Sequence, residues 1–197
     1  MHDTNRSDNR DTAQTAKSMT EQEFIARLRA GDPRAFEVLM VQYFDRLVRF
    51  AMQMVGTRDG AEDVAQDVFI RIWEQRASLD PTGSIKALLF AAVRNRALND
   101  VKAHRVRERY RETVVAEADQ DGGAGLVPSG EDVILTHAAF EAGLAMLSER
   151  HQVAIRLRLE EQLPYTEIGK ILEISAKAAE QLVLRAQDAL RRQVGKK

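Results

Sequence analysis

Residues 147–192 read LSERHQVAIRLRLEEQLPYTEIGKILEISAKAAEQLVLRAQDALRR and predict three helices in close succession. Ser148 and Ser175 stand where a helix N-cap prefers a small hydroxyl side chain, and Pro164 suits the first turn of a helix. Apolar residues follow each of them, and those expected in the helix after Ser148 are Val153, Ile155, Leu157 and Leu159. Because a further helix ends at Leu147, we expect four helices in the C-terminal part of the chain.

The last of these helices begins after Ser175 and has two different sides. Its predicted buried stripe comprises Ala179, Leu182, Val183, Ala186 and Leu190. The opposite side carries Lys177, Gln181, Leu184 and Asp188, with Arg185 beside them. A short helix, a tight turn at Glu173 and Ile174, and a longer helix form a helix-turn-helix, which places the start of its second helix in a DNA major groove. Spacing alone is equally compatible with a plain helical hairpin.

The N-terminal part of the chain predicts another run of helices. Thr20 and Glu23 form a capping-box pattern that starts a helix ending at Gly31. The next helix opens on Pro33 and closes at Gly56. The sequence therefore predicts two helices, each with its own start and stop signal, before residue 57.

A third helix is predicted within TRDGAEDVAQDVFIRIWEQRASLDP, residues 57–81. One side gathers the apolar residues Ala61, Val64, Ala65, Val68 and Ile72. The opposite side holds Asp63, Gln66, Asp67, Ile70 and Glu74. Ile70 is a large aliphatic residue in the middle of this acidic face. It is either a single exposed aliphatic that needs no explanation, or an apolar anchor for a protein partner inside an acidic rim.

A fourth helix, within residues 84–111, changes character along its length. Its first half is apolar, whereas residues 94–111 contain seven basic residues against two acidic ones. A charge run of one sign suits a phosphate backbone better than an ordinary solvated surface. We therefore interpret its second half as a candidate nucleic-acid contact.

Composition and charge define the domain organisation. The 197 residues are 44% hydrophobic and 30% charged, and only 6% are aromatic, which favours helix over sheet. Residues 112–133 carry six acidic residues and no basic one, together with glycines and a proline, which is typical of a linker. We expect an all-α protein with a disordered tail (1–19), a small helical domain (20–111), a flexible acidic linker (112–132) and a second small helical domain (133–197).

The sequence argues against several classes of protein. It has no cysteine, which excludes disulfides and thiol chemistry. No apolar run approaches the roughly 20 residues of a membrane span, and the N-terminus lacks the apolar core of a signal peptide, so we expect a cytoplasmic protein without direct membrane insertion. The histidines share no motif, and neither a phosphate loop nor a nucleophile elbow is present. We expect no enzyme, and therefore no catalytic residue, metal or cofactor.

Three stretches, in order, resemble the extracytoplasmic-function (ECF) sigma factors, compact two-domain specificity subunits of bacterial RNA polymerase. The family's core-binding segment is similar to GAEDVAQDVFIRIWE (60–74). Its promoter-melting and −10-reading segment is similar to SIKALLFAAVRNRALNDVKAHR (84–105), and its −35-binding domain to LSERHQVAIRLRLEEQLPYTEIGKILEIS (147–175). The resemblance favours the anchor interpretation of Ile70 and the helix-turn-helix interpretation. It implies a sigma factor that binds core polymerase, melts the −10 element and binds the −35 element.

The resemblance also implies three sets of contact residues. The polymerase-binding set is Asp63, Gln66, Asp67, Ile70 and Glu74. The −10 set is Ser84, Lys86, Arg94, Asn95, Arg96, Lys102 and Arg105, beside a loop (77–84) that would hold a flipped base. The −35 set is Ser175, Lys177, Ala178, Gln181 and Arg185. Core RNA polymerase and promoter DNA are the implied partners, and the family also allows an anti-sigma factor, membrane-associated or soluble.

The chain departs from the family pattern at several positions. Most relatives have glycine where Glu173 stands, an aromatic residue is common where Leu88 stands, and the helix after Ser175 is less basic than usual. Ser175, Lys177 and Glu180 match the start of a subgroup associated with iron transport and nutrient uptake. An alternative function is a sigma-like helix-turn-helix regulator or decoy that binds a regulatory protein instead of promoter DNA.

Overall fold

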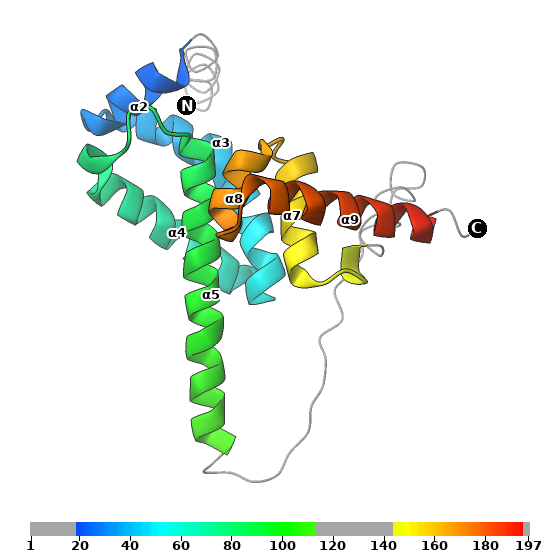
Figure 1. The fold of residues 1–197 in the computed structure, drawn as a ribbon. Helices are drawn as coiled ribbons and strands as arrows, with labels where there is room; N and C mark the ends of the chain where they lie inside the picture. Colours follow the sequence, from blue (N-terminus) through cyan, green and yellow to red (C-terminus); the bar gives the residue numbers. More distant parts are fainter. Residues whose placement is uncertain (1–18, 113–143, 195–197) are drawn as a thin grey trace, which may run out of the picture. The chain divides into compact units, whose positions relative to one another are not determined.

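The computed structural model of the protein describes residues 19–112 and 144–194, and every regular element in these ranges is a helix (Figure 1). The chain divides into two compact units, Met1–Val101 and Lys102–Lys197. The predicted all-α class with two helical domains is confirmed. The predicted tail and linker lie almost wholly outside the described residues. Within the described ranges, no helix combines the length and apolar character that a membrane span needs.

The first described helix, α2 (Glu21–Arg29), carries the predicted capping box. The Thr20 hydroxyl accepts a hydrogen bond from the Glu23 N–H at 3.2 Å, and a Glu23 carboxylate oxygen accepts from the Thr20 N–H at 2.9 Å. The backbone bond from Thr20 lowers the pKa of Glu23. At the other end of α2, the Arg27 guanidinium donates to the Asp32 carboxylate at 2.7 Å, which lowers the pKa of Asp32. Both ends of α2 are therefore held by local polar bonds.

Helices α3 (Pro33–Val55) and α4 (Arg58–Glu74) form the body of the N-terminal unit. α3 starts and stops as predicted, at its N-terminal proline and at Gly56, which adopts the left-handed conformation with φ 82°. α4 buries the apolar side predicted from the sequence, which comprises Ala61, Val64, Ala65, Val68 and Ile72.

Aromatic rings fill the region where α4 packs on α3. The buried ring of Phe69 lies edge-on to Phe36, with the centroids 6.2 Å apart, and stacks on Phe44 at 6.2 Å with an angle of 27° between the ring planes. Trp73 adds a further contact to Phe36 at 4.8 Å. Because rings of this size pack in only a few geometries, the cluster fixes the rotation of α4 about its own axis.

A one-turn helix, η1 (Arg76–Ser78), and a loop lead into the long helix α5 (Ile85–Glu112). The first half of α5 supplies buried residues to the N-terminal unit: Ile85, Ala87, Leu89, Phe90, Val93 and Ala97. The division between the two units falls after Val101, within this helix. The basic half of α5 therefore continues past the core of the first unit.

The C-terminal unit contains the helices α7 (Glu149–Leu159), α8 (Tyr165–Leu172) and α9 (Ala176–Val194), as predicted. α9 packs against both α7 and α8. Of its predicted stripe, Leu182 is half-buried and the rest is buried: Ala179, Val183, Ala186 and Leu190. Of the helix predicted before α7, only the end at Leu144 and Ala145 belongs to the described residues.

Two details of α7 differ from the sequence-based expectation. Ser148 occupies the N-cap position, but its hydroxyl bonds to Nδ1 of His151 at 2.7 Å instead of capping a backbone N–H. Leu159, expected in the apolar stripe, is 45% exposed because it is the last residue of the helix. The buried side of α7 is formed by Val153, Ala154, Ile155 and Leu157.

The turn between α8 and α9 is a Schellman motif centred on a non-glycine residue. Glu173 is left-handed, with φ 56° and ψ 46°. The Ile174 N–H donates to the Gly169 carbonyl at 2.9 Å, and the Glu173 N–H donates to the Lys170 carbonyl at 3.3 Å. The left-handed conformation costs an L-residue about 1–2 kcal/mol, so glycine would be the more stable residue at this position.

Gly169 allows this turn to fold back closely on α8. A Cβ atom added at Gly169 would lie 2.7 Å from the Ile174 carbonyl oxygen and 3.2 Å from the Ala176 nitrogen. Both are backbone atoms, which cannot move aside as a flexible side chain can. The start of α9 is therefore positioned by direct backbone contact with α8.

We expect Glu173→Gly to stabilise the C-terminal unit by about 0.5–1 kcal/mol, the relief of the left-handed strain minus the added freedom of glycine in the unfolded chain. Hydrogen exchange of the buried α9 amides of Val183 and Ala186 in the full chain should slow correspondingly. Glu173→Ala is the control, because it removes the side chain but keeps Cβ and the strain. Equal exchange in both variants would contradict the strain argument.

We expect Gly169→Ala to destabilise the same unit by about 1–3 kcal/mol through overpacking against backbone. Helix propensity alone predicts the opposite sign, since alanine is favoured over glycine by about 1 kcal/mol inside a helix. Faster exchange of the α9 amides would support the close approach. Slower exchange would show that the turn shifts without cost.

Candidate polymerase and nucleic-acid interfaces

The outer face of α4 carries the predicted polymerase-binding set. Ile70 is 55% exposed at the centre of this face. Asp63, Gln66 and Glu74 are also exposed, and Asp67 is half-buried. The helical projection made from the sequence agrees with this pattern, because four of the five residues are exposed and none is buried. Their contact with a partner stays a prediction.

The structure brings together two residues that the sequence assigned to different surfaces. Nε of Arg96, in α5, donates to Asp67 Oδ2, in α4, at 2.8 Å, and Nη1 of the same guanidinium pairs with Asp100. The Arg96 side chain is 26% exposed. Ion pairs near the surface stabilise by only about 0–1 kcal/mol, so the importance of this pair is geometric. It links the expected polymerase face of α4 to the expected DNA-reading helix α5.

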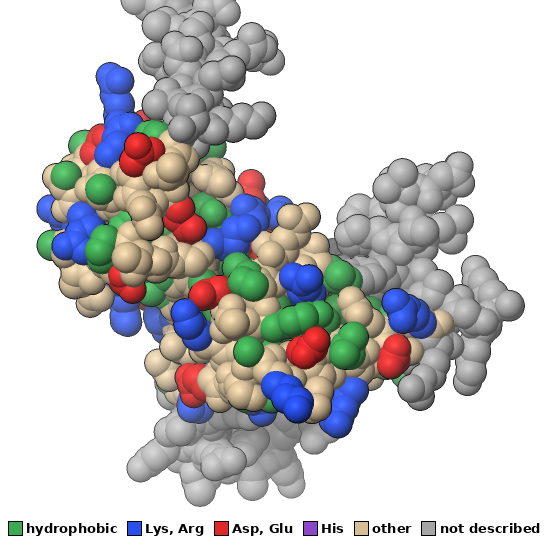
Figure 2. Space-filling model, turned by 45° about the horizontal axis from the view of Figure 1, so that its top comes forward, with side chains coloured by type: hydrophobic (Ala, Val, Ile, Leu, Met, Phe, Trp, Pro, Cys, Tyr) green, Lys and Arg blue, Asp and Glu red, His purple; other side chains and the backbone are tan. Residues whose placement is uncertain are grey.

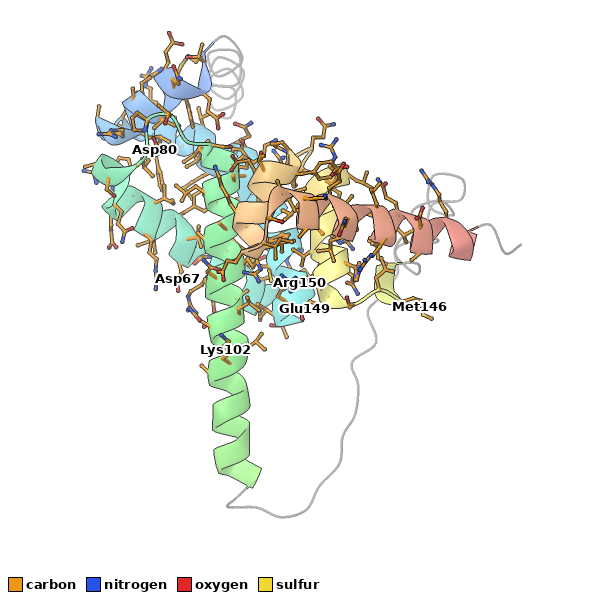
Figure 3. The ribbon with its side chains drawn as sticks, viewed as in Figure 1. Asp67, Asp80, Lys102, Met146, Glu149 and Arg150 are labelled. Atoms are coloured by element: carbon orange, nitrogen blue, oxygen red, sulfur yellow. The ribbon has the colours of Figure 1, made fainter. Side chains whose placement is uncertain are left out.

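The loop predicted to hold a flipped base has a folded turn of its own. Asp80 Oδ1 accepts from both the N–H and the hydroxyl of Thr82, at 2.9 and 2.8 Å. The Gly83 N–H donates to the Asp80 carbonyl at 3.2 Å, and Leu79 is buried. Asp80 lies on the connection between α4 and α5 in Figure 3. This geometry is an Asx turn, which limits the conformations open to the loop.

The −10 set follows this loop into α5. Ser84 caps α5, since its hydroxyl accepts from the Ala87 N–H at 3.3 Å. Asn95 and Lys102 are exposed, whereas Lys86 and Arg94 are half-buried. The Arg105 side chain lies outside the described part of the structure. Leu88, where an aromatic is common in relatives, is 40% exposed and so has room for one.

The −35 set lies at the start of α9. Ser175 is the cap, and its hydroxyl accepts from the Ala178 N–H at 3.1 Å. Lys177, Gln181 and Arg185 are exposed, and Ala178 is half-buried. The predicted helix-turn-helix geometry is thus present: a short helix, a tight turn and a longer helix whose first turns are open to solvent.

The outer side of α9 also carries groups that oppose DNA binding. Glu180 and Asp188 are exposed, and Asp188 pairs with Arg191 at 3.7 Å. Leu184 is 48% exposed among them. Figure 2 shows acidic and basic side chains interspersed on each of the parts that it draws. An α9 surface of this kind supports few phosphate contacts.

Sequence reasoning missed two long-range bonds that hold the 77–84 loop from α2. A Glu21 carboxylate oxygen accepts from the Ile85 N–H at 2.9 Å, and Arg29 donates to the Leu79 carbonyl. The partners are 64 and 50 residues apart in sequence, so no local pattern could have indicated these bonds. The exposed charges at both ends of α2 are the only signal that the sequence offers.

Metal-binding geometry is not found in the described ranges. No group of three or more His, Asp or Glu side chains there could hold a metal ion. His151 bonds instead to Ser148 at the start of α7.

Two family models match the chain. The model of Sigma-70 region 2 matches residues 39–107, and that of Sigma-70, region 4 matches residues 143–192. Together they cover more than half of the chain. The first spans α4 and most of α5, with their expected polymerase and −10 residues. The second spans the helix-turn-helix.

Similar proteins cover nearly the whole length of the chain. The ECF RNA polymerase sigma factor SigW of Bacillus subtilis is 25% identical over 177 residues, which are 86% of this chain and 94% of that protein. The ECF RNA polymerase sigma-E factor of Escherichia coli K12 is 25% identical over 181 residues, 89% of this chain and 94% of that protein.

Solved structures show the same fold. The sigma factor RpoE from Bartonella quintana, in complex with the anti-sigma factor NepR, matches with a TM-score of 0.61 and 23% identity over 82% of this chain and 97% of that one. CnrH, in complex with the cytosolic domain of CnrY, matches with a TM-score of 0.61 and 21% identity, covering 89% of this chain and 97% of that one. The chain therefore belongs to the sigma-70 family and is an ECF sigma factor, a non-enzymatic subunit that directs RNA polymerase to initiate transcription at promoters.

Proposed function

We propose that this sigma factor contacts core RNA polymerase through the outer face of α4, the −10 element through the 77–84 loop and α5, and the −35 element through the start of α9. The observation that carries the assignment is Ile70, a large aliphatic side chain that is 55% exposed on a face otherwise made of acidic and polar residues. An apolar anchor in a polar rim is the usual composition of an energetic hot spot.

The polymerase contact would be formed by Ile70 with Asp63, Gln66, Asp67 and Glu74 around it. The acidic rim favours a basic partner surface and steers the encounter. The apolar side of α4 is buried and α4 packs on α3, so exposed Ile70 could bind a partner without unfolding of the unit.

Ile70→Asp should weaken binding of the full chain to core polymerase by about fivefold or more, because a carboxylate would enter a desolvated contact. Val41→Asp is the matched control, since Val41 is 67% exposed on α3, away from the proposed set. The measurement is the dissociation constant for core polymerase, with helicity followed by circular dichroism. The anchor role of Ile70 would be contradicted if Ile70→Asp bound core polymerase with wild-type affinity, or if Val41→Asp lost as much affinity as Ile70→Asp.

Promoter melting would use the 77–84 loop and α5. A base flipped out of the −10 element would enter the loop, Asn95 would read an adjacent base, and Arg94, Lys102 and Arg105 would hold phosphates. Binding of flipped bases offsets the few kcal/mol that unstacking costs per base. This allows opening without ATP. Arg96 belongs to the same set, but its bonds to Asp67 and Asp100 make it a link between α4 and α5 in the free protein.

Duplex −35 DNA would lie against the start of α9. Gln181 and Arg185 are the side chains able to make bidentate base contacts, and Lys177 and the Ser175 cap region favour phosphate. Glu180 and Asp188 repel the backbone. We therefore expect the C-terminal unit to contribute weak −35 affinity with a shallow salt dependence.

Gln181→Ala and Arg185→Ala should each change the −35 base preference of holoenzyme transcription, with a loss of about 1–3 kcal/mol at the contacted base pair. Promoters for the test come from run-off transcription of a genomic library with wild-type holoenzyme. Arg191→Ala, which removes an exposed cation from the far end of α9, is the control and should keep the preference.

The possible results distinguish a promoter-binding sigma factor from a sigma-like regulator or decoy. Unchanged rates and base preference in both variants would make α9 a packing helix. A wild-type chain that binds core polymerase but yields no promoter-dependent transcript would favour the sigma-like decoy. The exposed Leu184, Glu180 and Asp188 on the outer side of α9 are the observation that keeps this second function in view.

Further partners follow from the relatives. The sigma factor RpoE, which has the same fold, was solved in complex with the anti-sigma factor NepR, and we propose that an anti-sigma factor also controls this chain. Ser175, Lys177 and Glu180 support placement in the iron-transport and nutrient-uptake subgroup. A polymerase-binding subunit acts where polymerase acts, so we propose a cytoplasmic location.

A further inference from the structure

Helix α2 makes hydrogen bonds to both ends of the 77–84 loop. At the C-terminal end of the loop, Glu21 accepts a hydrogen bond of 2.9 Å from the N–H of Ile85, the first residue of α5. At the N-terminal end, Arg29 donates to the Leu79 carbonyl, directly after η1. α2 also packs on η1. One short helix thus fixes the positions of both ends of the loop.

The chemistry of both bonds suits a positioning role. The start of a helix has unpaired N–H groups and a partial positive charge, so a carboxylate binds there more strongly than a neutral acceptor. Glu21 and the Ser84 hydroxyl divide this task, since Ser84 accepts from the Ala87 N–H and Glu21 from the Ile85 N–H. The carbonyl at Leu79 receives a guanidinium N–H, which is again a charge-assisted bond.

α2 lies outside both segments that match the family models, which cover residues 39–107 and 143–192. It also has no residue in the polymerase, −10 or −35 sets. Its buried residues, Ile25 and Leu28, attach it to the unit, while Glu21 and Arg29 are exposed. These two exposed residues bond to the backbone of Leu79 and Ile85, which are buried, so they join α2 to the loop at defined points.

We propose that Glu21 and Arg29 are positioning residues for promoter opening: they hold the 77–84 loop in the shape that receives a flipped −10 base. The inference rests on the proposed −10 role of this loop. A loop that must be ordered on binding spends part of its binding free energy on that ordering. Here the loop is ordered beforehand by the Asp80–Thr82 turn within it and by the two bonds from α2.

The test measures base capture separately from folding and from polymerase binding. Holoenzyme is reconstituted from core polymerase and the full chain, as wild type, Glu21→Ala, Glu21→Gln or Arg29→Ala. The probes are single-stranded non-template oligonucleotides that span the −10 element, intact or with one abasic site at each position in turn. The readout is the ratio of the two dissociation constants, abasic over intact, at each position.

For the wild type we expect a large ratio at the flipped base. Glu21→Ala and Arg29→Ala should each lower that ratio by about 3- to 10-fold, the value of one net hydrogen bond, through weaker binding of the intact strand alone. Glu21→Gln should fall between wild type and Glu21→Ala, because it keeps an acceptor but loses the charge. Affinity for core polymerase should be unchanged in every variant, since the Ile70 face is untouched.

Glu23→Ala is the matched control. It removes the capping box of α2, on the same helix turn as Glu21, but leaves both bonds to the loop in place. The proposal is overturned if Glu23→Ala lowers the ratio as much as Glu21→Ala does, because α2 would then act only through general stability. It is also overturned if Glu21→Ala and Arg29→Ala keep the wild-type ratio. A wild type without any base-dependent position would instead disprove the −10 pocket itself, before any variant is compared.

Discussion

The contact between α3 and α4 determines where the functional surfaces of the N-terminal unit lie. Phe69 packs between Phe36 and Phe44, and Trp73 closes the cluster on Phe36. Side chains of this volume leave α4 little rotational freedom. Since the apolar side of α4 faces α3, Ile70 must face the opposite way. The exposure of that residue is thus a consequence of core packing, and the surface that results has an apolar centre and an acidic border.

The C-terminal unit depends on a different constraint, the closeness of two backbones. Gly169 leaves the space in which the chain turns back from α8 into α9. The turn then places α9 across α7 and α8, with its first turns exposed. Glu173 occupies the left-handed position of that turn at some cost in stability, whereas Gly31 occupies the equivalent position after α2 with φ 77° and no such cost. The same hydrogen-bond motif is therefore built with and without strain in one chain.

Local patterns predicted the helices well, because most of them carry a start or a stop signal in their own sequence. Thr20, Pro33, Gly56 and Ser175 were sufficient to place helix ends, and period 3.6 identified the buried sides of α4 and α9. Contacts between distant residues could not be obtained in this way. The bond from Glu21 to Ile85 and the pair between Arg96 and Asp67 join residues 64 and 29 positions apart, where no periodicity operates. For Arg96 the consequence is substantial, since a residue expected to face DNA is engaged by two carboxylates in the free protein.

The length of the continuous helix α5 has a further consequence for the spacing of the basic residues. Its 28 residues rise by about 1.5 Å each, so the helix is on the order of 40 Å long and keeps its direction beyond the last core residue, Ala97. The basic positions between residues 94 and 111 extend over about 25 Å of that length. One strand of B-form DNA advances by roughly 3.4 Å per nucleotide, so this stretch of helix is as long as about seven nucleotides of a duplex strand. In the proposed −10 contact, the length of this one helix would set how far along a DNA strand the basic positions of the chain extend from the 77–84 loop.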